Sequence, residues 1–194
     1  VIPNGVDQTI FRPTENDLRK KLGLEHSFVI LGVANVWERR KGLSYFCGLA
    51  KKLPEDCKII LIGLNEKQIR ELPEEIIGIT RTENAEELAG YYSMADVFVN
   101  ATLEDNFPTT NLEALSCGTP VITFETGGSP ESLDATCGRV VRKGDAEALR
   151  LTILAEREHP MKKEDCLTRA VQYEKNDRFM EYAALYHRLW GQGE

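Results

Sequence analysis

The sequence lacks several features that would assign it to a common class at once. Apolar residues make up 42% of the 194 residues, yet they form no run of about 18, the length needed to cross a membrane. Neither G-x-x-x-x-G-K-[ST] nor G-x-G-x-x-G occurs, which argues against P-loop nucleotide hydrolases and dinucleotide-binding enzymes. No Asp-x-Asp metal motif follows a predicted strand. We therefore expect any phosphate site to work without a metal ion or cofactor.

Basic residues are too few for a nucleic-acid partner. The chain holds 24 Lys and Arg against 31 Asp and Glu, a net charge of −7, and shows no basic stripe that would release counterions from a phosphate backbone. The five cysteines form no C-x-x-C pair, so we expect reduced core thiols in a cytoplasmic protein. The three histidines are far apart and are expected at the surface. These residues are Cys47, Cys57, Cys117, Cys137, Cys166, His26, His159 and His187.

Apolar runs of strand length alternate with segments of helical periodicity along most of the chain. This alternation predicts βαβ crossovers and a parallel sheet of about six strands, in a Rossmann-like three-layer α/β/α fold. Ligands on such sheets bind beyond the carboxyl ends of the strands. Strands are expected over 28–34, 58–62, 76–80, 97–101 and 121–124, with a short sixth at 139–141. Helices are expected over 15–22 (capped by Thr14), 41–53, 84–95, up to Leu72 and Cys117, and within 145–191.

The segment DNFPTTNLEALSCGTP, from Asp105 to Pro120, contains the most informative spacing. Asp105 and Glu113 stand eight residues apart, and the residues between them indicate a turn that leads into a helix. A helix N-terminus offers free N–H groups and a positive dipole end to phosphate, while a carboxylate accepts hydrogen bonds from hydroxyls. The pattern predicts a site for a phosphorylated, hydroxyl-rich ligand such as a nucleotide-sugar. An ordinary loop and helix remains the alternative.

Further candidate residues follow other predicted strands. Arg40 and Lys41 come after the first strand and suit a diphosphate, with Gly42 allowing close approach. A solvated basic turn is the alternative for these three. Arg81 and Thr82 end the third strand; taken alone, Arg81 is better explained as a surface charge. The pair Gly127-Gly128 follows the fifth strand, as an anion-facing turn or a flexible connection.

Four segments together resemble the C-terminal, donor-binding half of retaining GT-B glycosyltransferases, family 4 (glycosyl transferases group 1). They are VIPNGVDQTIFRP, RKGL, the run from YYSMADVF to GGSPE, and YEKNDRFMEYAALYHRLW. The resemblance implies that 1–194 is one donor-binding domain and half of a GT-B fold, with the N-terminal acceptor domain absent. Residues 1–13 would be a remnant of the interdomain linker and 174–192 a crossover-type C-terminal helix. We expect the apolar stripe of that helix to pack on its own domain; the alternative is that, with the first domain absent, part of the stripe is exposed or repacked.

The resemblance also implies roles for individual residues. Lys41 and an Arg would hold the donor pyrophosphate; the family Arg stands five residues before the Lys, where this chain has Val36, so the role passes to Arg40. Arg81 and Thr82 would lie in a loop that runs alongside the nucleobase. Asp105, or the adjacent Glu104, would bind sugar hydroxyls, and Glu113 the ribose. Gly42, Asn106, Phe107, Pro108, Thr109 and Thr110 complete the expected donor site, although Pro108 has no amide to donate.

The implied reaction is transfer of a sugar from a nucleoside-diphosphate sugar, with retention, to a saccharide or lipid-linked acceptor. The expected setting is cell-surface polysaccharide biosynthesis, with the full-length enzyme cytoplasmic or peripheral to the inner face of the membrane. This chain alone is expected to be inactive. Two alternatives stay open: a GT-B-like sugar-nucleotide epimerase, and a non-catalytic nucleotide- or phosphate-binding module such as a receiver domain.

Overall fold

Six parallel strands form one sheet in the order β3-β2-β1-β4-β5-β6. The computed structural model describes residues 1–190. Each strand begins and ends within one residue of its predicted range, which confirms the Rossmann-like α/β class. The strands are β1 (Phe28–Val33), β2 (Cys57–Ile62), β3 (Ile76–Ile79), β4 (Val97–Asn100), β5 (Val121–Phe124) and β6 (Gly138–Val141).

The strand order reverses between β1 and β4. From β1 the chain builds outward through β2 to β3, then returns to the other side of β1 and continues through β4 and β5 to β6. The crossovers on the two sides of this point leave it in opposite directions, so the loops after β1 and β4 diverge and leave a crevice between them. This point therefore has the geometry of a ligand site before any side chain is considered.

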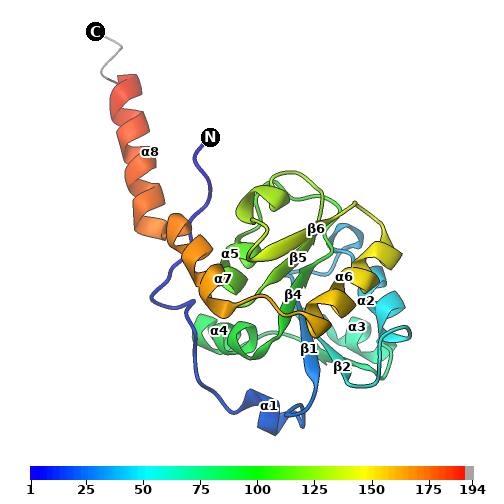
Figure 1. Ribbon diagram of the computed structural model, residues 1–194. Coiled ribbons are helices and arrows are strands. Elements are labelled where there is room, and N and C mark those ends of the chain that lie inside the picture. Colours follow the sequence, from blue (N-terminus) through cyan, green and yellow to red (C-terminus); the bar gives the residue numbers. More distant parts are fainter. Residues whose placement is uncertain (191–194) are drawn as a thin grey trace.

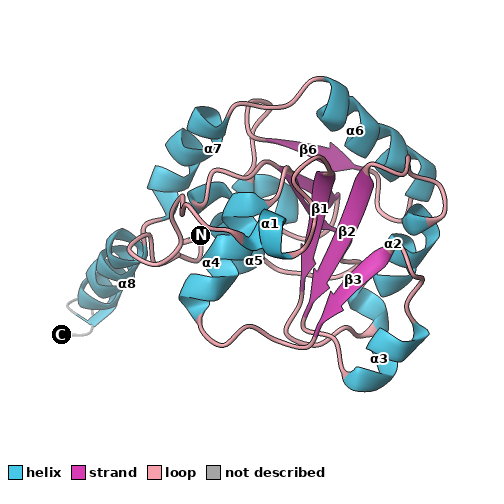
Figure 2. Cartoon of the chain, turned by 90° about the horizontal axis from the view of Figure 1, so that it is seen from below, coloured by secondary structure: helices cyan, strands magenta, loops and turns pink. Residues whose placement is uncertain are grey.

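Helices cover both faces of the sheet (Figures 1 and 2). One apolar cluster joins the sheet to α2, α3 and α6, and the other joins it to α1, α4, α5 and α7. Because both faces are covered, successive residues of a strand such as Ile30 and Leu31 are buried in opposite clusters. The helices are α1 (Leu18–Lys21), α2 (Leu43–Ala50), α3 (Glu66–Glu71), α4 (Ala85–Met94), α5 (Thr109–Ser116), α6 (Ala146–Glu158), α7 (Lys163–Ala170) and α8 (Lys175–Trp190), with 3₁₀ turns η1 (Arg39–Lys41), η2 (Ser129–Ser132) and η3 (Val171–Tyr173).

Two helix predictions were wrong at their N-termini. The helix expected from Lys41 begins at Leu43, because Gly42 has φ +80° and separates the turn η1 from α2. The helix expected after Thr14 is only the short α1, preceded by Asp17 rather than capped by Thr14.

The histidines are exposed as expected. Four cysteines are buried and only Cys47 is partly exposed, in a hollow of about 440 Å³.

The C-terminal helix α8 projects away from the sheet (Figure 1) and has no buried residue. The expectation that its apolar stripe packs on its own domain was wrong: Phe179, Tyr186 and Trp190 are exposed. It is held by the N-terminal segment: Val6 and Glu174 form a parallel bridge, Lys175 pairs with Asp7, and the Tyr182 hydroxyl donates to the Ile2 carbonyl at 3.1 Å. Residues 191 and 192 of the predicted helix lie outside the described residues. Among residues 1–190, no helix combines the length and apolar character that a bilayer crossing requires.

Candidate functional site

A cavity of about 390 Å³ opens between the loops that follow β1 and β4. It lies at the reversal of strand order, where a ligand is expected on an open parallel sheet. Residues 33–36, Glu38, Arg40 and Lys41 line it from the first loop, and Asp105 with residues 107–110 from the second. Seven sequence-predicted site residues therefore line one opening.

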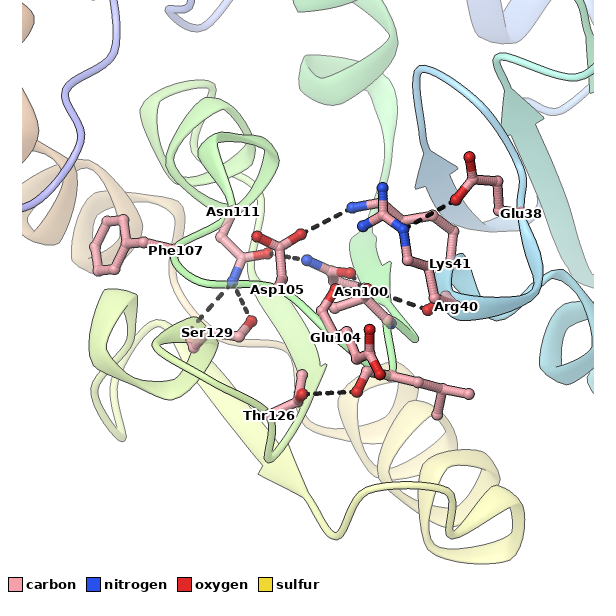
Figure 3. Close-up of polar contacts among 12 residues, drawn as sticks. Glu38, Arg40, Lys41, Asn100, Glu104, Asp105, Phe107, Asn111, Thr126 and Ser129 are labelled. Atoms are coloured by element: carbon pink, nitrogen blue, oxygen red, sulfur yellow. Dashed lines mark hydrogen bonds and ion pairs between the residues drawn. The ribbon is translucent and has the colours of Figure 1, made fainter.

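One ion pair spans this opening (Figure 3). The Lys41 ammonium (Nζ) lies 2.8 Å from the Asp105 carboxylate (Oδ2), and the two side chains are 24% and 18% exposed. The adjacent acid, Glu104, is exposed and is not part of the cavity wall. Of the two acids that the sequence left as alternatives, only Asp105 contacts the lysine and lines the cavity.

Gly42 fixes the first loop, although it does not line the cavity. A Cβ at this position would come within 2.1 Å of the Ala101 carbonyl oxygen, and the backbone is left-handed there. The absence of a side chain at Gly42 thus lets the backbone just after β4 pack closely against the first loop. The Arg40 carbonyl accepts hydrogen bonds from the Leu103 amide at 2.7 Å and the Thr102 hydroxyl at 3.2 Å. These contacts tie the two loops together beneath the lysine.

The Arg40 side chain reaches the cavity wall but is paired elsewhere. Its guanidinium (Nε) donates to the Glu38 carboxylate at 3.0 Å, and about half of the side chain, 48%, is exposed. An exposed pair of this kind contributes little and is easily exchanged. Arg40 is therefore near the opening, with a weaker hold on its position than Lys41 has.

The glycine pair after β5 supports the second loop. A Cβ on Gly127, which has φ +49°, would come within 1.8 Å of the Asp105 carbonyl oxygen. The Gly128 amide donates to the Asn106 carbonyl at 2.7 Å. Neither glycine lines the cavity, so this turn holds residues 105 and 106 in place rather than facing a ligand. Asn106 itself is exposed and lies outside the cavity wall.

A buried polar network, which sequence reasoning missed, holds the start of α5 (Figure 3). The Asn111 amide accepts from Asn100 Nδ2 at 2.8 Å and donates to the hydroxyls of Ser129 and Ser132, each at 3.0 Å. The Thr123 and Ser129 hydroxyls are 2.7 Å apart. Asn111 is fully buried. Asn111 stands among Thr109, Thr110 and Glu113 in α5, so local polarity does not single it out, and its partners cannot be read from local spacing.

Glu113 lies one turn beyond Thr109 on α5 and does not line the cavity. Its carboxylate (Oε2) accepts a hydrogen bond from the Tyr92 hydroxyl at 2.9 Å, between α5 and α4. Burial raises the pKa of the Glu113 carboxyl, and hydrogen bonds from Tyr92 and Thr109 oppose that rise. The structure thus brings Lys41 and Asp105 together at the cavity, whereas Glu113 is outside the cavity lining and contacts Tyr92.

Arg81 and Thr82 lie in a different hollow of about 520 Å³, with Thr80 and Glu83. This hollow follows β3, the edge strand two places from β1. Both hollows are at the carboxyl edge of the sheet, but they share no lining residue. Within residues 1–190, no cluster of three or more His, Cys, Asp or Glu side chains is arranged to hold a metal ion.

Phe107 connects the cavity to both ends of the chain. Its ring packs against Tyr173 with centroids 5.8 Å apart. Its carbonyl accepts a hydrogen bond from the Asn4 side chain at 3.0 Å. The N-terminal segment and the region before α8 therefore both touch the loop that carries Asp105.

The sequence is similar to those of several known glycosyltransferases. The chain is 29% identical over 160 residues to the MMP alpha-(1->4)-mannosyltransferase of Mycolicibacterium hassiacum, covering 77% of this chain and 37% of that protein. It is 31% identical over 156 residues to the D-inositol 3-phosphate glycosyltransferase of Corynebacterium jeikeium, covering 69% and 37%. The chain thus spans well under half the length of these relatives.

A solved structure shows the same fold. The crystal structure of Anabaena HepE in complex with UDP-glucose superposes with a TM-score of 0.85 at 20% identity, covering 97% of this chain and 57% of that one. The sequence profile of the family described as glycosyl transferases group 1 matches residues 27–155, about two thirds of the chain. The chain therefore belongs to the glycosyl transferases group 1 family.

Proposed function

We propose that this chain is the donor-binding half of a glycosyltransferase and holds the diphosphate of a nucleoside-diphosphate sugar in the cavity between the β1 and β4 loops. The observation that carries the proposal is the Lys41–Asp105 pair across that cavity. A cation and a carboxylate at one opening match a ligand with charged phosphates next to sugar hydroxyls. The start of α5, with Thr109 and Thr110 in the wall, adds backbone amides and a positive dipole end.

In the bound state, Lys41 exchanges Asp105 for a phosphate oxygen. The pair is mostly buried, so the phosphate must replace the contact that the lysine gives up, and the lysine has three protons to donate. The freed carboxylate then accepts hydrogen bonds from the sugar. As the diphosphate leaves the sugar, Lys41 and the helix dipole stabilise the charge where it develops. Arg40 would contribute a second cation after releasing Glu38.

The remaining site residues extend this arrangement. Arg81 and Thr82, along the same edge of the sheet, would receive the nucleobase, and Glu113 would bind the ribose after turning from Tyr92 past Thr109. We propose that no metal ion is required, because the chain's own cation and helix N-terminus face the diphosphate. The names of relatives support sugar transfer, and HepE of Anabaena is a neighbour that binds UDP-glucose. They do not agree on one sugar, so we propose no particular donor.

The acceptor side is proposed to come from a second domain. The relatives are more than twice as long as the part that this chain matches, so we expect this chain alone to bind donor weakly and to transfer little. For the full-length enzyme we propose retention at the sugar carbon and a saccharide or lipid-linked acceptor. A role in cell-surface polysaccharide synthesis, at the cytoplasmic face of the membrane, fits such acceptors.

Calorimetry of the 194-residue chain with UDP, GDP and ADP tests the proposal. We expect one of the three to bind, and to bind more tightly than inorganic phosphate, because the base and ribose add contacts. A receiver domain, which would need acidic residues after its first strand, should bind none of them. Absence of binding by all three nucleotides at millimolar concentration would overturn the proposed function.

A further inference from the structure

We infer that Asn111 is a positioning residue that sets the geometry of the Lys41–Asp105 pair without touching the ligand. The inference rests on the proposed function, since it concerns the same cavity. Asn111 is fully buried and does not line the cavity. Its amide nevertheless makes hydrogen bonds to two separate parts of the fold, the end of β4 and the turn η2, which an apolar residue of similar size would not make.

The first connection runs from Asn111 to the strand that precedes the acidic loop. Its carbonyl oxygen (Oδ1) accepts from Asn100 Nδ2 at 2.8 Å, and Asn100 is the last residue of β4. This hydrogen bond therefore joins the residue before the 101–108 loop to the first turn of the helix that follows the loop. Since Thr109 and Thr110 directly precede Asn111 and line the cavity, a shift of this amide would move the wall with it.

The second connection runs from Asn111 to η2. Its amide nitrogen (Nδ2) donates to the hydroxyls of Ser129 and Ser132. Ser129 follows Gly128, whose amide donates to the Asn106 carbonyl. The loop that carries Asp105 is thus held from the α5 side and from the η2 side, and both supports converge on Asn111.

Complete burial makes this network sensitive to loss of one member. Asn111, Thr123, Ser129 and Ser132 are all fully buried, so a partner left without a hydrogen bond has no water to replace it. Local repacking of α5 against η2 would then be favoured. Its direct effect would be on the position of Asp105, and through the ion pair on Lys41.

The test compares Asn111→Leu, which keeps the volume and removes all three hydrogen bonds, with Leu149→Ala. Leu149 is a fully buried residue of α6 on the other face of the sheet. Both variants should lose stability, and both are studied where each is fully folded by circular dichroism. We expect Asn111→Leu to weaken binding of the preferred nucleoside diphosphate about tenfold, and Leu149→Ala to leave it within about twofold.

Amide hydrogen exchange provides a readout that does not need a nucleotide. In Asn111→Leu we expect faster exchange confined to residues 105–112 and 128–132 relative to the sheet, and in Leu149→Ala faster exchange around α6. Equal affinities in the two variants, or exchange that rises uniformly in Asn111→Leu, would overturn the positioning role. If the unaltered chain binds none of the nucleotides, the proposed function fails, and the exchange pattern alone decides for or against Asn111. Ser129→Ala, which removes one partner, should give the same pattern to a smaller extent.

Discussion

The ammonium of Lys41 lies 2.8 Å from the carboxylate of Asp105, although the two residues are 64 positions apart in the sequence. The pair is the contact through which the β1 loop and the β4 loop face each other across the cavity. Without a ligand, the negative charge of Asp105 neutralises the ammonium of Lys41, the same group that we propose binds the diphosphate. Under the proposed function, binding would be a competition between an internal carboxylate and an external phosphate for one ammonium group.

Replacing Lys41 by Ala should weaken nucleoside diphosphate binding by about tenfold or more, because a charge-assisted hydrogen bond is lost. Calorimetry with the nucleotide that the unaltered chain prefers measures the effect. Lys51→Ala removes an exposed lysine just after α2 and controls for net charge. Equal losses in the two variants would show that Lys41 acts only through the overall field.

Replacing Asp105 by Asn should strengthen binding of the nucleoside diphosphate without sugar, by about twofold to tenfold, because the competing carboxylate is removed. Glu104→Gln makes the same change of charge one residue earlier, on an exposed side chain outside the cavity. We expect Glu104→Gln to have little effect in the same titration. If both variants gained equally, the ion pair would not be the relevant competitor.

Nucleotide binding should be unchanged when EDTA replaces magnesium in the buffer. The positive charge that faces the diphosphate comes from Lys41 and from the first turn of α5, and neither depends on a divalent cation. Isothermal titrations in the two buffers give the comparison directly. A loss of affinity in EDTA, restored by added magnesium, would contradict the metal-independent site.

Gly42→Ala should destabilise the fold by about 2 kcal/mol or more, because the residue has a left-handed backbone and no room for a Cβ. Gly48→Ala is a matched control six residues later, at an exposed position within α2 with no atom near the added methyl group. That substitution should stabilise the chain by about 0.5–1 kcal/mol. Urea unfolding of both variants measures the difference, and a destabilised Gly48→Ala would contradict this account.

Glu113→Gln should stabilise the chain at neutral and alkaline pH. Burial raises the pKa of this carboxyl above its ordinary 4.5, so its contribution to stability is full below pH 4.5 and is lost as pH rises through the higher native value. Glutamine avoids burying a charge and can still accept from Tyr92. Urea unfolding from acid to alkaline pH should show an advantage of the variant that grows with pH; exposed Glu55→Gln is the control. A constant difference at every pH would contradict the raised pKa.

The sequence predicted the sheet well because parallel strands covered on both faces must be continuous apolar runs. FVILGV and VITF, for example, correspond to β1 and β5. It was also predictable that Lys41 and Asp105 would lie at the same edge of the sheet, since each follows a strand and the carboxyl ends of parallel strands meet. Their mutual contact was not predictable, because it depends on the strand order, which local patterns do not encode.

Other features depend on contacts between distant segments. Helical spacing placed a helix start at Lys41, but the approach of Ala101 imposes a left-handed backbone at Gly42. The hydrogen bonds of Asn111 join residues up to 21 positions away, and no periodicity reports them. Whether the apolar face of α8 is covered or exposed could not be decided, because an amphipathic pattern shows that a face is apolar without showing what covers it.

The unequal exposure of the cysteines has a practical consequence. Burial raises the pKa of all five thiols, but only Cys47 is partly open to solvent. It shares its hollow with Trp37 and Arg39, close before Lys41 in the chain. A maleimide fluorophore applied at mildly alkaline pH would therefore attach at one place, and its emission would follow the β1 loop during a titration without any cysteine having to be engineered in or out.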